Sequence, residues 1–336
     1  MFQPNIQSMQ LSTPVALPVL PRISQAETIV ALGSCFGVAM GRRLQRAGFD
    51  VTGGQFGTLF NPESIRLTIA RALDGMVPPP QEFNEHDGLY VHTGYHSILA
   101  RGSVEEAQEA IELANAGLRE ALQHAEWLVV TFGTAWVYRL ASRGVVANCH
   151  RLPPSSFTRE LLSPEEMVEG WCTLVGRLRE LNPKLRIMLT VSPVRHLRDG
   201  LRENSVSKGA LHLVVHRLTT TLPDLYYFPA YEILIDELRD YRFYAEDMAH
   251  PSPQAEQIVW DRLQEAWLTP AARENARRIG DFFALLHHRP RVPGSPADRT
   301  AIAQLTVQLE ALRREFPSGQ WDEAERMLEA RKDACL

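Results

Sequence analysis

Residues 28–37 read TIVALGSCFG, and this stretch decides the fold class that the sequence predicts. The run 28–32 is short and mostly apolar, which is typical of a strand buried on both faces. Gly33 and Ser34 end the run, and residues 36–48 continue with apolar side chains at helical spacing up to an Ala-Gly pair. A buried strand followed at once by a helix indicates the first half of a βαβ unit.

The same alternation of strand and helix continues along the chain. Further strands are predicted at 49–51, 127–131, 185–191 and 225–228, with a hairpin within 136–149. Helices are predicted at 61–73, 104–124, 163–181, 205–221 and 253–268. Asn61 and Ser163 stand where helix N-caps are expected. We therefore expect an α/β protein whose sheet is mostly parallel and carries helices on both faces.

Three regions are expected from the composition along the chain. Residues 1–24 lack the basic and apolar segments of a signal peptide and are interpreted as an N-terminal arm. Residues 25–270 form the main domain, with 75–102 as an inserted loop or small hairpin rich in Pro, Gly and His. Residues 271–336 contain no strand signal and are expected to form a helical C-terminal extension, with helices near 271–287 and 298–314.

The overall composition excludes several classes of protein. The chain has 336 residues, 45% of them apolar and 22% charged, as in globular proteins rather than disordered or collagen-like ones. Its net charge of −5 argues against a nucleic-acid partner. Its four cysteines lie far apart without a CxxC pair, which argues against a zinc knuckle or a disulfide framework and suits the cytoplasm. No apolar stretch approaches the roughly 18–20 residues of a membrane span.

Ser34 is the first candidate for chemistry, because ligands of open α/β sheets bind beyond the C-terminal ends of the strands. A serine in a tight turn between a strand and a helix exposes its hydroxyl at that edge, near the helix N-terminus, which favours developing negative charge. On this pattern alone Ser34 is a nucleophile or a plain helix N-cap.

Asp247 and His250 form the second candidate site, in a loop after the last predicted strand. Because the two residues are three positions apart in a loop, the carboxylate can accept a hydrogen bond from the imidazole and leave the other ring nitrogen to take a proton from a serine. The alternative is an exposed loop histidine beside an unrelated capping aspartate. Since Ser34 follows the first strand, both sites can meet at one edge of the sheet.

Several sequence blocks then resemble one known family. GSCFG at 33–37 is a close variant of the signature that names the GSCFA family, which is related to the SGNH (GDSL-like) hydrolases. Further similar blocks follow in order: FGTAWVYR at 132–139, NCHRLP at 148–153, VSPVRH at 191–196 and DYRFYAEDMAHPS at 240–252. The resemblance covers about residues 25–270. It implies a three-layer α/β/α flavodoxin-like sandwich in which Ser34 is the nucleophile, His250 the base and Asp247 its orienting carboxylate.

The resemblance also implies an oxyanion hole, and here the sequence departs from the pattern. Backbone N–H groups of Ser34 and Gly57 are the expected donors. SGNH enzymes add an Asn after the third strand, but that position holds Ala135. The Thr134 hydroxyl, the Asn61 carboxamide or a nearby histidine is then expected to take its place.

The remaining candidates are substrate-binding residues near the same edge: His96, His150, His196, Trp136 and Arg195. The alternative for each histidine is a ring satisfied by backbone hydrogen bonds. We expect no cofactor and no metal, since no pair of histidines with supporting carboxylates stands out. Cys35 follows the nucleophile position and is expected to pack against the sheet.

Taken together, the sequence predicts ester chemistry by a Ser-His-Asp triad. The substrate is expected to be a small-molecule or glycan ester, with water (esterase) or a sugar hydroxyl (O-acyltransferase) as the second acceptor. One alternative is a catalytically weak or inactive glycan-binding module on the same scaffold, which the alanine at position 135 suggests. Another is a structural role, in which the C-terminal helices dock a partner or join two copies into a homo-oligomer.

Overall fold

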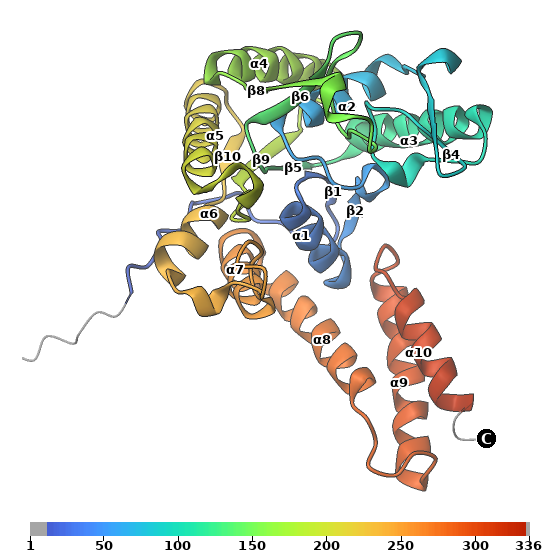
Figure 1. The fold of residues 1–336 in the computed structure, drawn as a ribbon. Helices are drawn as coiled ribbons and strands as arrows, with labels where there is room; N and C mark the ends of the chain where they lie inside the picture. Colours follow the sequence, from blue (N-terminus) through green and yellow to red (C-terminus); the bar gives the residue numbers. More distant parts are fainter. Residues whose placement is uncertain (1–11, 334–336) are drawn as a thin grey trace, which may run out of the picture.

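The computed structural model describes residues 12–333 and is built on a parallel sheet of five strands (Figure 1). The strands are β1 (Thr28–Gly33), β2 (Asp50–Thr52), β5 (Trp127–Phe132), β9 (Arg186–Val191) and β10 (Leu225–Tyr227). They lie in the order β2-β1-β5-β9-β10, with every pairing parallel. This is the flavodoxin-like order, whose direction of winding reverses between β1 and β5. The predicted α/β class is confirmed.

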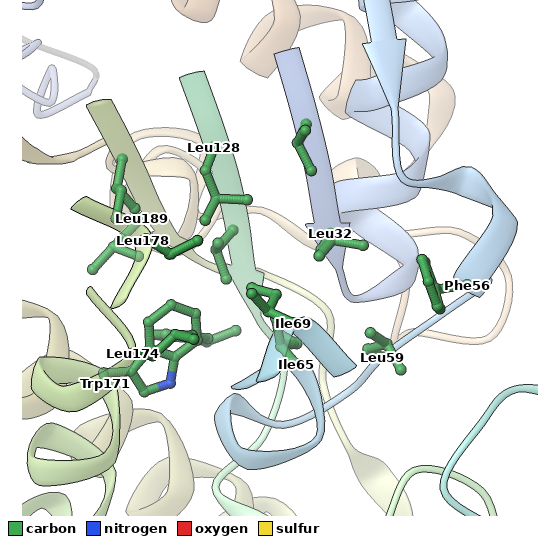
Figure 2. Packing of buried hydrophobic residues seen from close by; sticks show 14 of the residues in the cluster. Leu32, Phe56, Leu59, Ile65, Ile69, Leu128, Trp171, Leu174, Leu178 and Leu189 are labelled. Carbon is green, nitrogen blue, oxygen red and sulfur yellow. The ribbon is translucent and has the colours of Figure 1, made fainter. Parts of the chain in front are cut away.

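Helices cover both faces of the sheet and bury two separate cores. One face carries α2 (Pro62–Asp74), α3 (Val104–His124), α4 (Pro164–Leu181) and α5 (Leu201–Thr221). Figure 2 shows this core, where strand leucines such as Leu32 and Leu128 face Ile65 of α2 and Trp171 of α4. The other face carries α1 (Cys35–Arg46) and α7 (Pro253–Trp267).

Local sequence signals explain where these elements begin and end. Asn61 Oδ1 accepts from Ser64 N at 2.7 Å and caps α2, as predicted. Ser163 and Glu166 form a reciprocal capping box at α4. Gly33 closes β1 at φ 142°, where a side chain would place its Cβ 2.4 Å from the carbonyl oxygen of Thr131. Only glycine fits there, because β1 and β5 approach closely at the point where the chain turns.

Two small sheets lie outside the central one. The predicted insertion contains a hairpin of β3 (Asn84–His86) and β4 (Leu89–Val91). The second hairpin, β6 (Trp136–Leu140) with β7 (Gly144–Val146), is also present, and a third strand, β8 (Phe157–Leu161), pairs with the free side of β6. This strand was not predicted, because FTREL is short, half-exposed and polar at its centre.

Short helical turns complete the domain. They are η1 (Gly54–Phe56), η2 (Pro80–Glu82), η3 (Ser97–Leu99), η4 (Pro154–Ser156), η5 (Leu197–Asp199), α6 (Ala230–Glu232), the π-helical η6 (Ile233–Leu238) and η7 (Tyr241–Phe243).

The C-terminal region is helical, as predicted, but holds a third helix. It consists of α8 (Pro270–His287), α9 (Pro296–Glu315) and α10 (Asp322–Asp333), with α9 and α10 side by side (Figure 1). These helices share an apolar core of their own. The helix α10 escaped prediction because its sequence is mostly charged and it buries only Ala324 and Leu328. An ion pair of 3.2 Å between Arg46 and Glu323 links the region to α1.

The described part of the N-terminal arm, residues 12–24, lies against the domain. Leu20 and Ile23 are buried beside α7, and Ile23 forms an isolated parallel bridge with Leu268. The first eleven residues of the predicted arm lie outside the described residues. Within residues 12–333, no helix combines the length and apolar character needed to cross a membrane.

Candidate active site

The candidate site lies at the C-terminal edge of the central sheet, where the strand order reverses. Ser34 directly follows β1 and Gly133 directly follows β5. The two residues touch, since a Cβ on Gly133 would lie 3.2 Å from Ser34 Cβ and 2.7 Å from the Phe60 carbonyl oxygen. This reversal point is where open α/β sheets bind their ligands.

The Ser34 hydroxyl has no hydrogen-bond partner among the described residues. The residue occupies the N-cap position of α1, yet its side chain caps no backbone N–H, and it is only 2% exposed. The Ser34 hydroxyl therefore does not act as a helix cap, which was the alternative to a nucleophile. Because buried hydroxyls are nearly always hydrogen-bonded, an unpartnered one at this edge marks a candidate reactive group.

Asp247 and His250 form the expected pair. Asp247 Oδ2 lies 2.6 Å from His250 Nδ1, while Oδ1 accepts from the backbone N–H groups of Ala249 and His250 at 2.9 Å each. These backbone bonds, and then the imidazole, lower the pKa of Asp247 to about 2. A carboxylate can only accept here, so Nδ1 carries the hydrogen and Nε2 is left as the base. Both side chains are about half exposed, at 51%.

Contacts between loops bring this pair to the sheet edge. Arg195 N, just after β9, donates to the Ala249 carbonyl at 3.0 Å. The ring of His196 packs edge-on against Phe60, with centroids 6.2 Å apart. A positive charge on His250 would lower the pKa of His196, so these two rings are electrostatic neighbours. Ser34, His196 and His250 are therefore gathered at one edge, although within residues 12–333 no hydrogen bond joins Ser34 to His250.

His196 is neutral at physiological pH. Burial, and then the charges of Lys208 and His250, lower its pKa to about 4, although a hydrogen bond with the Gly133 carbonyl opposes this. Its backbone N–H donates to Asn204 Oδ1 at 3.0 Å. His196 thus lies against the segment that touches the nucleophile, as a fixed and uncharged ring.

The two backbone donors expected for the oxyanion hole are both engaged within the protein. Ser34 N donates to Thr131 O at 3.1 Å, because the pairing of β1 with β5 continues one residue beyond the strand. Gly57 N donates to Gly54 O, also at 3.1 Å, because it closes the turn η1. In this structure neither N–H group is free for a substrate oxygen, which corrects the sequence-based assignment.

Of the proposed replacements, Thr134 is engaged as well. Its Oγ1 lies 3.0 Å from Ser207 Oγ and accepts from Trp136 N at 3.1 Å. Ala135, at the position of the missing asparagine, is fully buried and donates its N–H to Ser207 Oγ at 2.7 Å. Hydrogen bonds to Ser207 of α5 therefore hold this segment and occupy the Thr134 hydroxyl oxygen and the Ala135 N–H.

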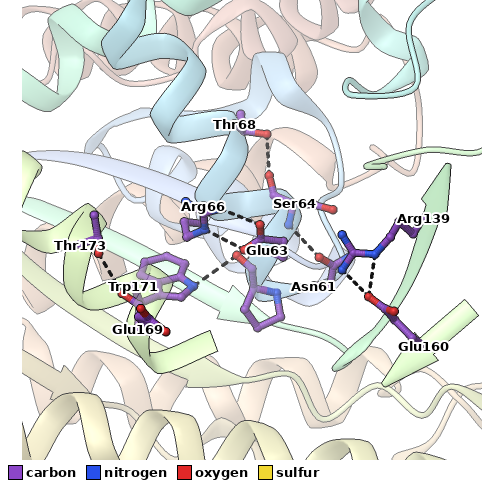
Figure 3. A network of polar contacts seen from close by, with 11 residues as sticks. Asn61, Glu63, Ser64, Arg66, Thr68, Arg139, Glu160, Glu169, Trp171 and Thr173 are labelled. Carbon is purple, nitrogen blue, oxygen red and sulfur yellow. Dashed lines mark hydrogen bonds and ion pairs between the residues drawn. The ribbon is translucent and has the colours of Figure 1, made fainter. Parts of the chain in front are cut away.

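Asn61 keeps a free donor. Its Oδ1 caps α2 through Ser64 (Figure 3), which leaves Nδ2 without a hydrogen-bond partner among the described residues. The preceding carbonyl, that of Phe60, accepts from Gly133 N at 2.8 Å and Thr134 N at 2.9 Å. Asn61 thus stands beside the segment that lacks the usual asparagine.

His96 and His150 lie at the insertion rather than beside Ser34. The Nε2 atom of the buried His150 lies 3.1 Å from the His92 carbonyl oxygen and 2.9 Å from that of Tyr95. Backbone carbonyls therefore satisfy this ring, which is the alternative to substrate binding that the sequence left open for His150. The ring of His96 packs on Gly57, where a Cβ would lie 2.5 Å from Nδ1.

Trp136 and Arg195 both take part in stacking within the protein. The Arg159 guanidinium lies 3.8 Å from the centroid of the Trp136 ring. Arg195 lies 4.1 Å from the ring centroid of Tyr244 and 5.6 Å from that of Tyr241. Arg195 is next to His196 and thus borders the candidate site, with its guanidinium held by aromatic faces.

Sequence reasoning missed Ser207 and Lys208, which lie under the site. Lys208 is 2% exposed, and its Nζ donates to Gly133 O and Ser192 O at 2.6 Å each. The signal was its spacing from Leu211 and Val215, which places a lysine on the buried face of a predicted helix.

Cys35 does not compete with Ser34 for the role of nucleophile. Its side chain is partly buried against the core beneath α1, as expected. Burial raises the pKa of this thiol, so it stays protonated at neutral pH. Among the described side chains, no three His, Cys, Asp or Glu residues gather where they could hold a metal ion.

The fold and the site together define an α/β protein with serine, histidine and aspartate at the C-terminal edge of a flavodoxin-like sheet. The model of the GSCFA family matches residues 28–263 of the sequence, which include all three residues. The chain belongs to the GSCFA family. No curated protein shows significant similarity to it.

Proposed function

We propose that the protein is a serine-dependent esterase or O-acyltransferase of the SGNH type. One observation carries the proposal: an unpartnered buried serine hydroxyl shares a sheet edge with a histidine whose Nδ1 is bound by a carboxylate. Apo hydrolases often hold the serine and the histidine too far apart to bond, and they tighten when substrate binds.

The reaction proceeds in two halves. Ser34 Oγ attacks the ester carbonyl carbon and passes its proton to His250 Nε2. When the tetrahedral intermediate collapses, the bond to the alcohol oxygen breaks, and His250 returns the proton to that alcohol. The acyl group stays on Ser34 until water or a sugar hydroxyl attacks it, again with His250 as the base. The second tetrahedral intermediate then collapses, the bond between the acyl carbon and Ser34 Oγ breaks, and His250 returns the proton to Ser34. Asp247 holds the imidazole in the required tautomer.

Stabilisation of the oxyanion falls to donors other than the two engaged backbone groups. Asn61 Nδ2 is the side-chain donor we assign, in place of the asparagine absent at position 135. Losing a single such donor typically costs about 10²–10³ in turnover. Asn61→Ala also removes the cap of α2, so Asn61→Asp, which can keep the cap but has no N–H donor, is the cleaner variant.

The surface beside the pair suits an organic ester. Exposed apolar side chains flank it: Phe60 (41% exposed), Leu197 (41%), Met248 (45%) and Tyr241 (67%). An acyl chain fits the aliphatic members, and a sugar ring fits the face of Tyr241. We propose an O-acylated carbohydrate or a similar small ester as the substrate.

The first test is labelling with a fluorophosphonate probe, read by intact-protein mass. We expect one adduct on the wild-type protein, and its loss in Ser34→Ala and His250→Ala. Ser163→Ala is the matched control, because Ser163 is an N-cap serine whose hydroxyl does bond its helix. If folded wild-type protein gains no adduct, or if Ser34→Ala still gains it, the proposal is wrong.

A catalytically weak glycan-binding module is the second candidate. The engaged N–H groups of Ser34 and Gly57 favour it, since they weaken the oxyanion hole. In that case Ser34→Ala would bind glycans as well as the wild-type protein does, and no acyl-enzyme would accumulate with any ester.

We propose the cytoplasm as the location, since the three described cysteines are free. We also propose that α8–α10 can join two copies of the chain. Truncation after residue 269 would then lower the assembled mass to less than half in size-exclusion chromatography with light scattering, whereas loss of only the removed residues' mass would contradict it.

A further inference from the structure

Lys208 is a buried cation without a counter-ion. It is 2% exposed, and its ammonium contacts two carbonyl oxygens but forms no ion pair with a carboxylate of the described residues. Burying a charge costs several kcal/mol unless it is paired or hydrogen-bonded. Two neutral carbonyls compensate only part of this, and burial lowers the pKa of Lys208 to about 7.

The two carbonyls belong to the ends of neighbouring strands at the candidate site. Gly133 follows β5 and touches Ser34, while Ser192 follows β9 and begins the segment that leads to His196. Ser192 N also donates to the Phe132 carbonyl at 2.8 Å. By binding both carbonyls, Lys208 joins the loop after β9 to the loop after β5, and the loop after β5 is the one that touches Ser34.

The groups that face Lys208 supply no permanent negative charge. They are Cys35 from α1, His196 from the segment after β9, and His212 from its own helix. Burial raises the pKa of Cys35 and lowers that of both histidines, so all three are neutral at pH 7. The charge of Lys208 therefore faces no resident anion, and it complements an anion that forms only during a reaction.

We propose that Lys208 is a positioning residue for acyl transfer at Ser34. In its charged form it fixes Gly133 and Ser192, and its buried charge favours the oxyanion that develops when Ser34 attacks the ester. This inference rests on the proposed function. In this proposal, Lys208 supplies part of the oxyanion stabilisation that an asparagine at position 135 would otherwise provide.

The test compares wild type, Lys208→Met and Lys208→Arg in p-nitrophenyl ester hydrolysis, with kcat and KM measured from pH 6 to 10. Methionine keeps the length and removes the charge, so we expect kcat to fall about 10²-fold with KM nearly unchanged. Arginine keeps the charge at every pH and should recover part of that loss. Wild-type kcat should decline as the pH rises above about 7, and Lys208→Arg should not show this decline.

A merely structural lysine predicts different results. Both variants would then melt at lower temperature, but kcat per folded molecule and the shape of its pH profile would match wild type, which overturns the proposal. Lys184→Met is the control, because Lys184 is exposed and lies before β9, at the opposite end of that strand from Ser192. If Lys208→Met does not fold, Lys208→Gln, which also removes the charge, takes its place, and a kcat per folded molecule equal to that of wild type overturns the proposal.

The two proposals fail in distinguishable ways. If wild-type protein hydrolyses no ester and takes no fluorophosphonate, the function fails and the inference with it. If Ser34 is labelled, but Lys208→Met is labelled at the wild-type rate with the same pH dependence, only the role of Lys208 is refuted.

Discussion

The C-terminal edge of the sheet and the helices α8–α10 treat polar groups differently. The helices bury leucines, isoleucines and aromatic rings, and their charged groups form ion pairs, as Arg278 does with Glu315 at 2.9 Å on the surface and the buried Asp298 does with Arg331 at 2.7 Å. At the sheet edge, a serine hydroxyl is buried without a hydrogen-bond partner, and a lysine ammonium is buried without a carboxylate counter-ion among the described residues. The helices follow the rules for stability, whereas the edge departs from them, and such departures are expected at functional sites.

The largest effect is expected from Asp247→Asn. Asparagine can present an N–H to His250 Nδ1 and so favour the wrong tautomer, and an equivalent loss in serine hydrolases lowers kcat by about 10⁴. We expect a loss of about 10³–10⁴ in kcat with an unchanged melting temperature, because the pair is half exposed. Asp240→Asn is the control, since Asp240 is an exposed aspartate that caps η7. Equal losses in both variants would contradict the role of the pair.

Leu309→Ala should weaken the helices without touching the chemistry. Leu309 is 6% exposed in the core of α8–α10, and such truncations cost about 2–5 kcal/mol. Hydrogen exchange should show lost protection confined to these helices. The fluorophosphonate labelling rate should stay within about twofold of wild type, an effect too small to reflect transition-state loss. A labelling rate that falls together with helix protection would show that the two regions are coupled.

Acid should destabilise the sheet edge through His196. The folded-state pKa of about 4 lies below the usual value of 6.5, so the unfolded chain binds more protons between these limits. The contribution of His196 to stability is therefore complete above pH 6.5 and is lost as the pH falls through about 4. Urea unfolding at several pH values should show a shallower acid loss in His196→Gln.

His92 provides the comparison for that experiment. Burial also lowers its pKa to about 4, but it lies in the insertion beside Glu82. His92→Gln should flatten the acid loss of stability and leave the labelling rate of Ser34 unchanged. If His196→Gln leaves the acid loss as steep as in wild type, the assigned pKa of His196 is wrong.

The smallest effects on stability are expected from alanine substitutions at two serines, Ser163 and Ser34. Removing the capping box at Ser163 should cost about 1 kcal/mol of stability and leave activity unchanged. Ser34→Ala should cost less stability than that, because its hydroxyl bonds nothing among the described residues. A larger stability loss for Ser34→Ala would mean that the hydroxyl has a structural partner after all.

The central elements could be predicted from sequence because buried strands alternate with capped helices. The helix at 104–124 has the predicted bounds, and the caps at Asn61 and Ser163 lie where their side chains indicated. Prediction failed where an element relies on a neighbour for its burial. The strand β8 needs β6 beside it, and α10 needs the faces of α8 and α9.

The location of the candidate site was predictable, but the state of its donors was not. Ser34 and His250 follow strands, and the ends of parallel strands meet at one edge. Whether the Ser34 N–H is free depends on the register between β1 and β5, which pairs Gly33 with Thr131. The role of Lys208 likewise depends on which carbonyls lie within reach of its helix, and this is set by tertiary packing.

The bridge at Ile23 makes the two ends of the domain neighbours. Ile23 N donates to Trp267 O and Thr269 N donates to Ile23 O, each at 2.9 Å. The first and last residues of the domain therefore lie side by side and are joined by backbone hydrogen bonds. A circular permutant could join these ends through a short linker and begin instead at the exposed turn near Ser142, between β6 and β7. Such a chain would carry the same sheet with Ser34 and His250 brought closer in sequence, and the domain could equally be inserted whole into a loop of a host protein.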